Sequence, residues 1–287
     1  MALSPARENR SVLLLVSPPA QGTFHNDNHE RLSLALEKRG LLVHHQPHNK
    51  LCLNNGIPHI GTYPLDAFEL IWPVGFGPQQ GYLDRLAILS LVEDSRFVSP
   101  PRTVFSLHNK SHWLEFAPET HMSNNSALLA DIVAQGGHWV LKPATGSFGR
   151  EVERVASAEE IYLRMADSAS AYWLLQRYIG AIKDGEYRTI IAGNNIIGTY
   201  LRKPRDGFHA NLSQEATAYA TELPESHEGV VAATHQALQD ARIGFAAIDT
   251  CGGYVLEVNV ANPGGLSTLD GLYGGRSADL VVDSIVS

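Results

Sequence analysis

The most constraining feature of this sequence is a predicted β-hairpin at residues 243–260, in which polar side chains interrupt two apolar strands. Its sequence is IGFAAIDTCGGYVLEVNV. Two apolar runs separated by glycines are typical of a hairpin with a tight turn. Residues two apart on a strand face the same side, so Glu257 and Asn259 share one face. The opposite face is then apolar, with Leu256, Val258 and Val260.

Asp249 joins that polar face if the turn holds an odd number of residues, such as Cys251-Gly252-Gly253. Unpaired carboxylates on one half-buried face repel each other, and a divalent cation removes that repulsion. Mg²⁺ is typically held by one or two carboxylates together with substrate phosphates. The alternative is a solvent-facing strand edge with scattered polar residues, and the hairpin alone does not decide between the two.

A second segment, residues 139–151, adds the chemistry of phosphate binding. Its sequence is WVLKPATGSFGRE, in which Lys142 lies in a strand-like run before a short glycine-containing loop. The loop lacks the Gly-Lys-Ser/Thr ending of a Walker loop and the third glycine of a dinucleotide-binding loop. Phosphate-binding lysines and Mg²⁺ serve the same ligand, so this segment favours a metal–phosphate site at the hairpin.

The first hundred residues predict an α/β domain. Short apolar runs indicate strands at residues 11–17, 41–46 and 68–74. A helix over residues 28–40 ends at Gly40, a common helix C-cap. Strand, helix and strand in this order predict a parallel sheet. Pro100 and Pro101 mark a candidate boundary, because successive prolines stop both helices and sheets.

Beyond about residue 100 the pattern changes. Helices are expected at about 107–115, 126–135, 157–168 and 224–242. Strands are expected at 138–143, 151–155 and 172–179. Residues 187–204 predict another hairpin, which turns at Gly193-Asn194-Asn195.

The overall composition excludes several classes of function. The net charge of −8 argues against a nucleic-acid-binding protein, which normally has a basic face. The apolar runs are far shorter than the ~20 residues of a membrane span, so we expect no membrane partner. Cys52 and Cys251 are the only cysteines, as expected in a reducing compartment. These features together predict a cytoplasmic protein.

Three blocks, taken in order, carry a resemblance to a known family: WVLKPATGSFG, LLQRYIGAIKDGEYRTIIAG and ARIGFAAIDTCGGYVLEVNVANPGG. They resemble the ATP-grasp superfamily and, within it, the prokaryotic glutathione synthetases, over roughly residues 98–272. The resemblance implies an ATP-grasp fold, α/β and α+β, with an N-terminal parallel-sheet α/β domain, a lid subdomain and a C-terminal antiparallel-sheet domain. The implied boundaries are 1–100 for the N-terminal substrate domain, 101–176 for the lid and 177–287 for the catalytic subdomain.

For ATP, the resemblance implies two lysines, a mobile loop, a hinge and an acid for the ribose. The lysines are Lys110 and Lys142, and the loop covers the phosphates with backbone N–H groups. Main chain at the hinge meets the adenine edge. The other ATP-binding residues that it implies are Gly146, Ser147, Phe148, Gly149, Gln176, Arg177, Tyr178, Ile179, Glu186 and Arg188.

For the metal, the resemblance implies Mg²⁺, with Mn²⁺ as a substitute, on the same three residues that the hairpin pattern suggests: Asp249, Glu257 and Asn259. The implied catalytic residues are Arg188, which contacts phosphate, and Arg202, which stabilises the tetrahedral transition state. Loop residues that could face a substrate are Asn211, Asn262 and Gly264.

The resemblance implies a ligase that makes a carboxylate reactive with ATP and joins it to an amine through an acyl phosphate. The substrate-binding parts differ from the family. Residues 73–84 read PVGFGPQQGYLD where the family has an arginine followed by Asp-Pro-Pro-Phe-Asp, and residues 261–264 read ANPG where it has Thr-Ser-Pro-Thr. These differences favour another small carboxylate, joined to an amino acid or amine, over γ-glutamylcysteine as the acceptor.

Two other functions stay open at this point. One is an ATP-grasp kinase that only phosphorylates its small-molecule substrate. The other is a non-catalytic ATP-binding module whose lid reports nucleotide occupancy. The retained Arg202 and the three metal positions favour catalysis, because a pure binder does not require them. The relatives also suggest a homo-oligomer, although no residue pattern indicates one.

Overall fold

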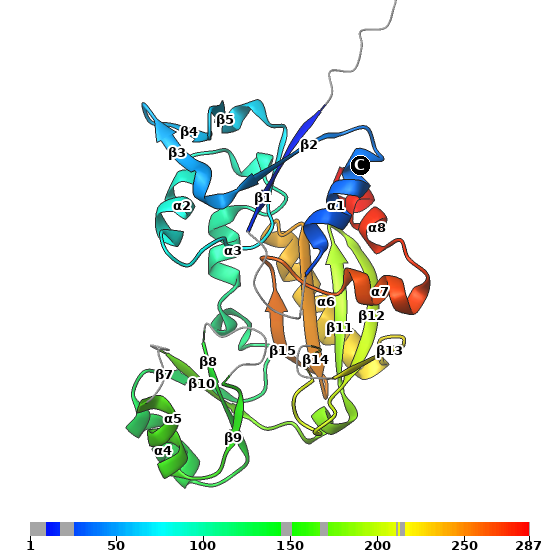
Figure 1. Ribbon diagram of the computed structural model, residues 1–287. Coiled ribbons are helices and arrows are strands. Elements are labelled where there is room, and N and C mark those ends of the chain that lie inside the picture. The colour runs from blue at the N-terminus through cyan, green and yellow to red at the C-terminus, as the bar shows by residue number, and fades with distance from the viewer. Residues whose placement is uncertain are drawn as a thin grey trace, which may run out of the picture.

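The computed structural model describes residues 10–17, 26–144, 151–166, 172–210, 212 and 216–286. The chain forms an N-terminal layer, a lid and a large antiparallel sheet, which occupy separate regions of the molecule (Figure 1). This arrangement is the predicted combination of α/β and α+β parts.

The N-terminal layer is a parallel sheet in the order β2-β1-β6, as the sequence predicts. Its strands are β1 (Ser11–Val16), β2 (Leu42–Pro47) and β6 (Leu70–Pro73), and α1 (Asn28–Glu37) lies between β1 and β2 in the chain. The central strand β1 is a continuous apolar run because both of its faces are buried.

A small antiparallel sheet within this layer is absent from the sequence-based expectations. It consists of β3 (Leu51–Asn54), β4 (Ile57–Ile60) and β5 (Tyr63–Pro64). The helix α2 (Tyr82–Leu89) follows β6 in the chain. Asn55 and Gly56 turn β3 into β4 with φ values of 49° and 80°. An Asn-Gly pair is a strong hairpin signal, because both positions require positive φ.

The prediction of a helix at about 107–115 is wrong, because the helix in this region lies earlier in the chain. The helix is α3 (Pro101–Leu107), and a short 3₁₀ turn, Lys110–Trp113, follows it. Pro101 occupies the first turn, where a missing N–H is harmless, so this proline starts a helix. Asn109 then interrupts the helix, since its side chain accepts a hydrogen bond from the Ser111 N–H.

The lid is a four-stranded antiparallel sheet in the order β7-β10-β8-β9, with two helices packed on it. The strands are β7 (Thr120–Ser123), β8 (Trp139–Pro143), β9 (Glu153–Val155) and β10 (Trp173–Arg177). The helices are α4 (Ser126–Ala134) and α5 (Ala158–Ala166). Ser157 and Glu160 exchange side chain-to-backbone hydrogen bonds and cap α5, as the sequence suggests.

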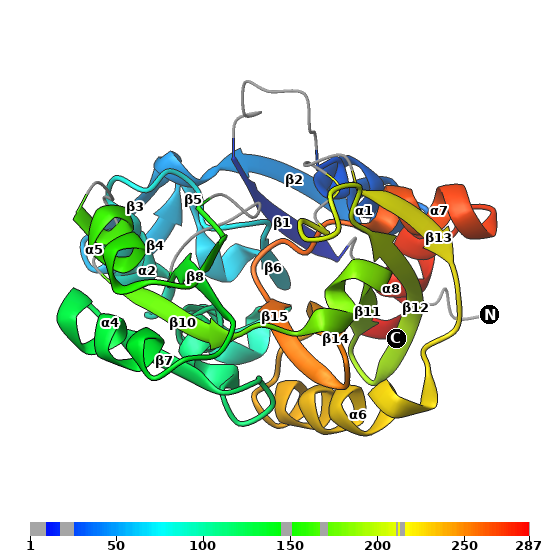
Figure 2. The same ribbon diagram turned by 90° about the horizontal axis from the view of Figure 1, so that it is seen from below.

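The largest sheet is antiparallel, in the order β13-β12-β11-β14-β15. Its strands are β11 (Glu186–Ala192), β12 (Asn195–Lys203), β13 (Thr217–Ala220), β14 (Phe245–Cys251) and β15 (Tyr254–Asn259). The helix α6 (Glu225–Asp240) packs on one face, and α7 (Leu266–Tyr273) and α8 (Ser277–Val286) pack on the other (Figure 2). Both hairpins predicted for this region are confirmed.

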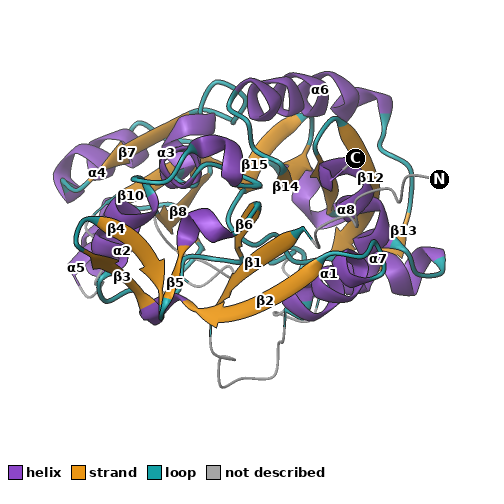
Figure 3. Ribbon diagram, turned by 90° about the horizontal axis from the view of Figure 1, so that it is seen from above, coloured by secondary structure: helices purple, strands orange, loops and turns teal. Residues whose placement is uncertain are grey.

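One hydrophobic core joins the first and last parts of the chain. It contains Leu14 of β1, Leu32 of α1, Phe245 of β14 and Val281 of α8. Figure 3 shows α1, α7 and α8 gathered at one end of the large sheet. The N-terminal layer therefore shares its apolar interior with the large sheet. In the described part of the chain, no helix combines the length and apolarity needed to cross a membrane.

Candidate nucleotide and metal site

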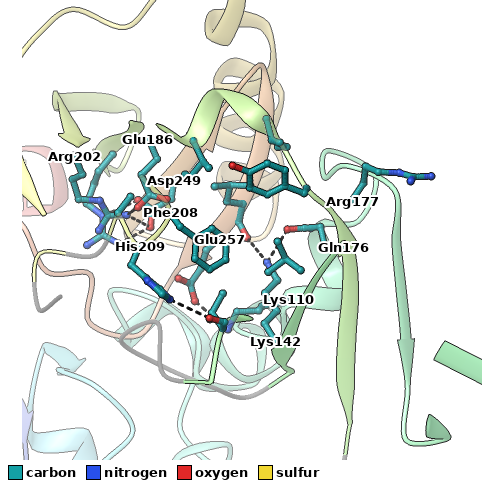
Figure 4. A pocket seen from close by; sticks show the side chains of 18 of the residues that line it. Lys110, Lys142, Gln176, Arg177, Glu186, Arg202, Phe208, His209, Asp249 and Glu257 are labelled. Atoms are coloured by element: carbon teal, nitrogen blue, oxygen red, sulfur yellow. Dashed lines mark hydrogen bonds and ion pairs between the residues drawn. The ribbon is translucent and has the colours of Figure 1, made fainter. Parts of the chain in front are cut away.

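A cavity of about 970 Å³, including its open mouth, lies between the lid and the large sheet (Figure 4). Its apolar walls include Val140, Ile179, Ile182, Phe208 and Leu256. Four basic and three acidic side chains face the same space: Lys110, Lys142, Arg188, Arg202, Glu186, Asp249 and Glu257. The cavity can hold a flat apolar group beside a charged one.

The two predicted ATP lysines meet in this cavity. Lys142 lies on β8 and is buried, and its Nζ donates to Oε1 of Gln176 at 2.9 Å and to the Leu256 carbonyl at 3.4 Å. The Gln176 amide is oriented by donating to Thr120 Oγ1 at 2.9 Å. Lys110 approaches from the other side and forms an ion pair with Glu257 at 3.1 Å.

Burial, together with the nearby charge of Lys110, lowers the pKa of Lys142 to about 8. The charged form loses its hydration in the cavity, and another cation adds repulsion. An anionic ligand supplies the missing opposite charge, so it stabilises protonated Lys142.

Nucleotide affinity should therefore fall as the pH rises through about 8, because the protonated form of Lys142 attracts phosphate. We expect the dissociation constant for ATP to be steady below that pH and to increase above it. Calorimetric titrations between about pH 7 and pH 9 measure this. Lys142→Gln should bind ATP more weakly, and its dissociation constant should no longer rise above about pH 8. If the same rise persists in this variant, another group causes the pH dependence.

The charged residues occupy two adjacent rows on one face of four neighbouring strands, and together we call them the charged row. Register pairs Arg202 of β12 with Glu186 of β11, Arg188 of β11 with Asp249 of β14, and Asp249 with Glu257 of β15. Directly opposed residues have Cβ atoms about 5 Å apart, so their side chains can interact. The pairing of the strands itself therefore builds the charged floor of the cavity.

A β-bulge produces the last of these pairings. The turn between β14 and β15 is the two-residue Gly252-Gly253, so the odd-numbered turn considered from the sequence is wrong. The register shifts between Asp249 and Thr250, where β15 contains one extra residue. This extra residue places Glu257, rather than Leu256, opposite Asp249. Leu256 consequently faces the cavity beside Glu257, although alternation along the strand placed it on the opposite face.

Two arginines neutralise Asp249, which is 2% exposed. Arg188 donates to both of its carboxylate oxygens, at 2.7 and 2.6 Å, and Arg202 lies 2.9 Å from Oδ2. Arg202 also forms an ion pair with Glu186. The Nε of Arg202 is buried without a hydrogen-bond partner, so this guanidinium can still take a ligand atom.

The pKa values of the three acids follow from burial and from these partners. Burial disfavours ionisation of Asp249, but Arg188 and Arg202 outweigh it, and the pKa of Asp249 is lowered. Burial likewise opposes ionisation of Glu257, and Lys110 reverses that effect and lowers its pKa. Burial raises the pKa of Glu186, and the attraction of Arg202 only partly offsets it.

These residues fit a hard cation bound together with phosphate. Asp249 and Glu257 are opposed on adjacent strands and supply carboxylate oxygens, which Mg²⁺ prefers. Among the described residues, no group of three His, Cys, Asp or Glu side chains forms a complete cage for a metal. Asn259 ends β15 opposite Ala247, two residues beyond Glu257, and is not among the residues that line the cavity. The donor set thus suits an ion that takes its other ligands from the nucleotide.

The predicted hinge lines the cavity next to β10. Figure 4 shows the side chain of Arg177 pointing away from the charged residues. Its guanidinium stacks over Trp139 and forms an ion pair with Glu119 at 2.7 Å. Tyr178 and Ile179 follow and line the apolar part of the cavity. The guanidinium of Arg177 therefore makes its contacts outside the cavity, which leaves its main chain to line the cavity wall.

Phe208 and His209 also line the cavity, although neither is among the individual site residues predicted from the sequence. Their loop is held by Asp206, which accepts from both of their N–H groups at 2.8 and 2.7 Å. Nε2 of His209 lies 3.1 Å from the Val152 carbonyl of the lid, so this loop spans the two sides of the cavity. The signal for it is the sequence Asp-Gly-Phe-His, in which an aspartate commonly caps the turn that follows.

The remaining predicted residues divide into two groups. Asn262 and Gly264 lie after β15. Asn262 accepts from Asn28 of α1 at 2.8 Å, and the Gly264 carbonyl accepts from Arg188 at 3.1 Å. The other predicted positions lie outside the described residues: Gly146, Ser147, Phe148, Gly149 and Asn211.

Comparisons with known proteins bear on the family and the fold of this chain. Residues 108–274 match the model of the prokaryotic glutathione synthetase ATP-grasp domain. A glutathione synthetase of Gloeobacter violaceus is 28% identical over 245 residues, which cover 79% of this chain and 75% of that protein. The fold is similar to that of a D-cycloserine synthetase, with a TM-score of 0.70 at 16% identity over 96% and 98% of the two chains. It is also similar to an ATP-grasp ligase solved with a precursor variant, Mg and ADP, with a TM-score of 0.68 at 12% identity over 97% and 98% of the chains.

Proposed function

Because the chain belongs to the family of prokaryotic glutathione synthetase ATP-grasp domains, we propose that it is an ATP- and Mg²⁺-dependent carboxylate–amine ligase. The observation that carries this proposal is the row of paired charges from Arg202 to Glu257 across four strands. Three carboxylates and four basic side chains around one cavity suit a nucleotide polyphosphate with its cation. The ADP and Mg in a structural neighbour support the same ligand pair.

In this proposal each charged residue has a distinct role. Asp249 and Glu257 hold Mg²⁺, with Asn259 nearby, and Mn²⁺ is a substitute for it. Bound Mg²⁺ neutralises the charge of the β- and γ-phosphates. Lys142 and Lys110 attract the phosphates, Glu186 binds the ribose, and the hinge at Arg177–Ile179 meets the adenine. Arg188 and Arg202 stabilise the negative charge that develops during the reaction.

The reaction has two steps. An oxygen of the substrate carboxylate attacks the γ-phosphorus, the bond from that phosphorus to the bridging oxygen breaks, and ADP leaves. The amine nitrogen then attacks the acyl carbon, phosphate leaves with the electrons of the carbon–oxygen bond, and the nitrogen releases a proton. Closure of the lid over the cavity would exclude water and protect the acyl phosphate from hydrolysis.

The substrates proposed here are a small carboxylate and a small amine other than the glutathione pair. The loop at residues 73–84 and the segment 261–264 differ from the family where substrates bind. The range of similar folds supports this, since one neighbour is a D-cycloserine synthetase and another was solved with a precursor variant.

The test is release of phosphate from ATP with Mg²⁺ and a panel of acids and amines, offered singly and in pairs. We expect ADP and phosphate to form only when one acid and one amine are both present, with an amide as the product. Phosphorylation of a single substrate would replace the ligase by a kinase. Tight ATP binding without turnover on any pair would instead indicate a non-catalytic ATP-binding module.

A further inference from the structure

A second cavity lies between the N-terminal layer and the large sheet, away from the charged row. It encloses about 560 Å³, including its mouth, and its walls come from β6, α2, α3, β14 and the end of β15. Most of its surface is apolar or aromatic, with Trp72, Phe76, Val104, Phe245 and Val260 among the lining residues. Such walls suit an apolar side chain.

One permanent cation, Arg85 of α2, faces this apolar space and is only 8% exposed. Its Nη1 donates to the Gln80 carbonyl at 2.8 Å, and its Nη2 donates to the carbonyls of Phe76 and Pro78. These bonds fix the direction of the guanidinium, and Nε has no partner. Among the described residues that line the cavity there is no Asp or Glu, so the charge lacks a counter-ion there.

A second buried polar atom, Nε2 of His48, also lacks a partner beside this cavity. His48 is 2% exposed, and its ring is held against Gly77, where an added Cβ would lie 2.7 Å from the ring. Burial and the charge of Arg85 lower the pKa of His48 to about 4, so the ring is neutral at pH 7. Unsatisfied buried polar atoms are uncommon in folded proteins, so these two atoms beside one cavity call for a partner that the protein chain does not supply.

The cavity lies beside the chain segment that directly follows β15, the strand of Glu257. The N–H of Gly75 donates to the Ala261 carbonyl at 3.2 Å, and both residues line the cavity. Ala261 lies four residues beyond Glu257, about 13 Å along an extended chain. A small molecule held by Arg85 can therefore extend toward the reacting centre.

We infer that this cavity binds the carboxylate end of an α-amino acid with an apolar side chain, which is the amine substrate of the ligation. This inference rests on the proposed function and narrows its substrate class. Arg85 Nε donates to the carboxylate. The apolar walls surround the side chain, and the amine faces the mouth. A carboxylate held by a guanidinium is not the one that is phosphorylated.

The first test uses the unmodified protein without ATP, so that it does not depend on turnover. Isothermal titration calorimetry compares L-leucine and L-phenylalanine with L-leucinamide, which lacks the carboxylate, and with L-glutamate, whose side chain is charged. We expect leucine or phenylalanine to bind, and leucinamide and glutamate to bind about 10-fold more weakly or not at all. Equal binding of leucinamide, equal binding of glutamate, or binding of neither apolar amino acid overturns the inference.

The second test assigns the binding to the cavity. Arg85→Gln should weaken leucine or phenylalanine about 10-fold or more. Its matched control is Arg96→Gln, which removes another arginine that donates to two loop carbonyls, of Asp66 and Phe68, but lies outside the cavity. Val104→Phe leaves Arg85 in place and fills the cavity, so it decides the question if Arg85→Gln does not fold. Thermal unfolding of each variant verifies the fold.

Retained affinity in a folded Arg85→Gln or Val104→Phe variant, or an equal loss in Arg96→Gln, overturns the assignment. The ligase proposal can fail separately. If leucine or phenylalanine binds through Arg85 but no acid supports ADP formation, the cavity stands and the ligase does not. If ligation proceeds with an amine that has no carboxylate, at a rate unchanged by Arg85→Gln, the ligase stands and this site does not.

Discussion

Glu257→Gln should reduce Mg²⁺-dependent turnover by roughly 100-fold or more. Glutamine keeps the shape of the side chain but removes the charge that faces Lys110 and that we assign to the metal. Initial rates of ADP formation over a range of Mg²⁺ concentrations give both the maximal rate and the apparent metal affinity. We expect weaker dependence on Mg²⁺ as well as a lower maximum.

The matched control for this prediction is Glu153→Gln on the lid. Glu153 is also paired with a basic residue, Arg164 at 2.6 Å, but it does not line the cavity. This variant should retain the activity of the unmodified protein. Full activity in Glu257→Gln would remove Glu257 from the metal site.

Asp249→Asn should be the most destabilising single change in the site, by about 3–5 kcal/mol. Asp249 is 2% exposed and neutralises Arg188 and Arg202, so its loss leaves buried positive charge without compensation. Denaturant unfolding followed by circular dichroism measures the free energy. Arg188→Met in the Asp249→Asn background should recover part of the loss, because the double variant no longer buries that cation.

An exposed pair provides the comparison for this effect. Glu69 pairs with Arg10 at 2.6 Å, with both side chains about half exposed. Glu69→Gln should change the free energy of unfolding by less than about 1 kcal/mol, since water screens such pairs. A similar change in Asp249→Asn would mean that its carboxylate does not compensate the two arginines.

The sequence predicts the large sheet well because both of its hairpins carry strong turn signals and apolar strands. It also identifies Asp249 and Glu257 as neighbours, although for a partly wrong reason. Alternation along β15 cannot reveal a bulge, which depends on the pairing with β14. Leu256 therefore faces the cavity, contrary to the strict two-residue period.

Other parts of the site depend on contacts that are distant in the sequence. Lys110 and Glu257 form an ion pair although 147 positions separate them in the sequence, and no local pattern near Lys110 predicts that partner. The helix expected at 107–115 failed for a local reason, because Pro101 starts the helix early and Asn109 ends it. The roles of the individual residues and the three domain boundaries stay predictions.

The shared core of α1 and α8 has a consequence for synthesis on the ribosome. Arg39, just after α1, donates to Asp283 of α8 at 2.6 Å, although 244 positions separate them. At roughly 5–20 residues per second, α8 emerges some 10–50 s after its partner. During that interval the part of α1 that packs on α8 has no native cover. Nascent chains of this protein should therefore depend on a holding chaperone until the last helix has been made.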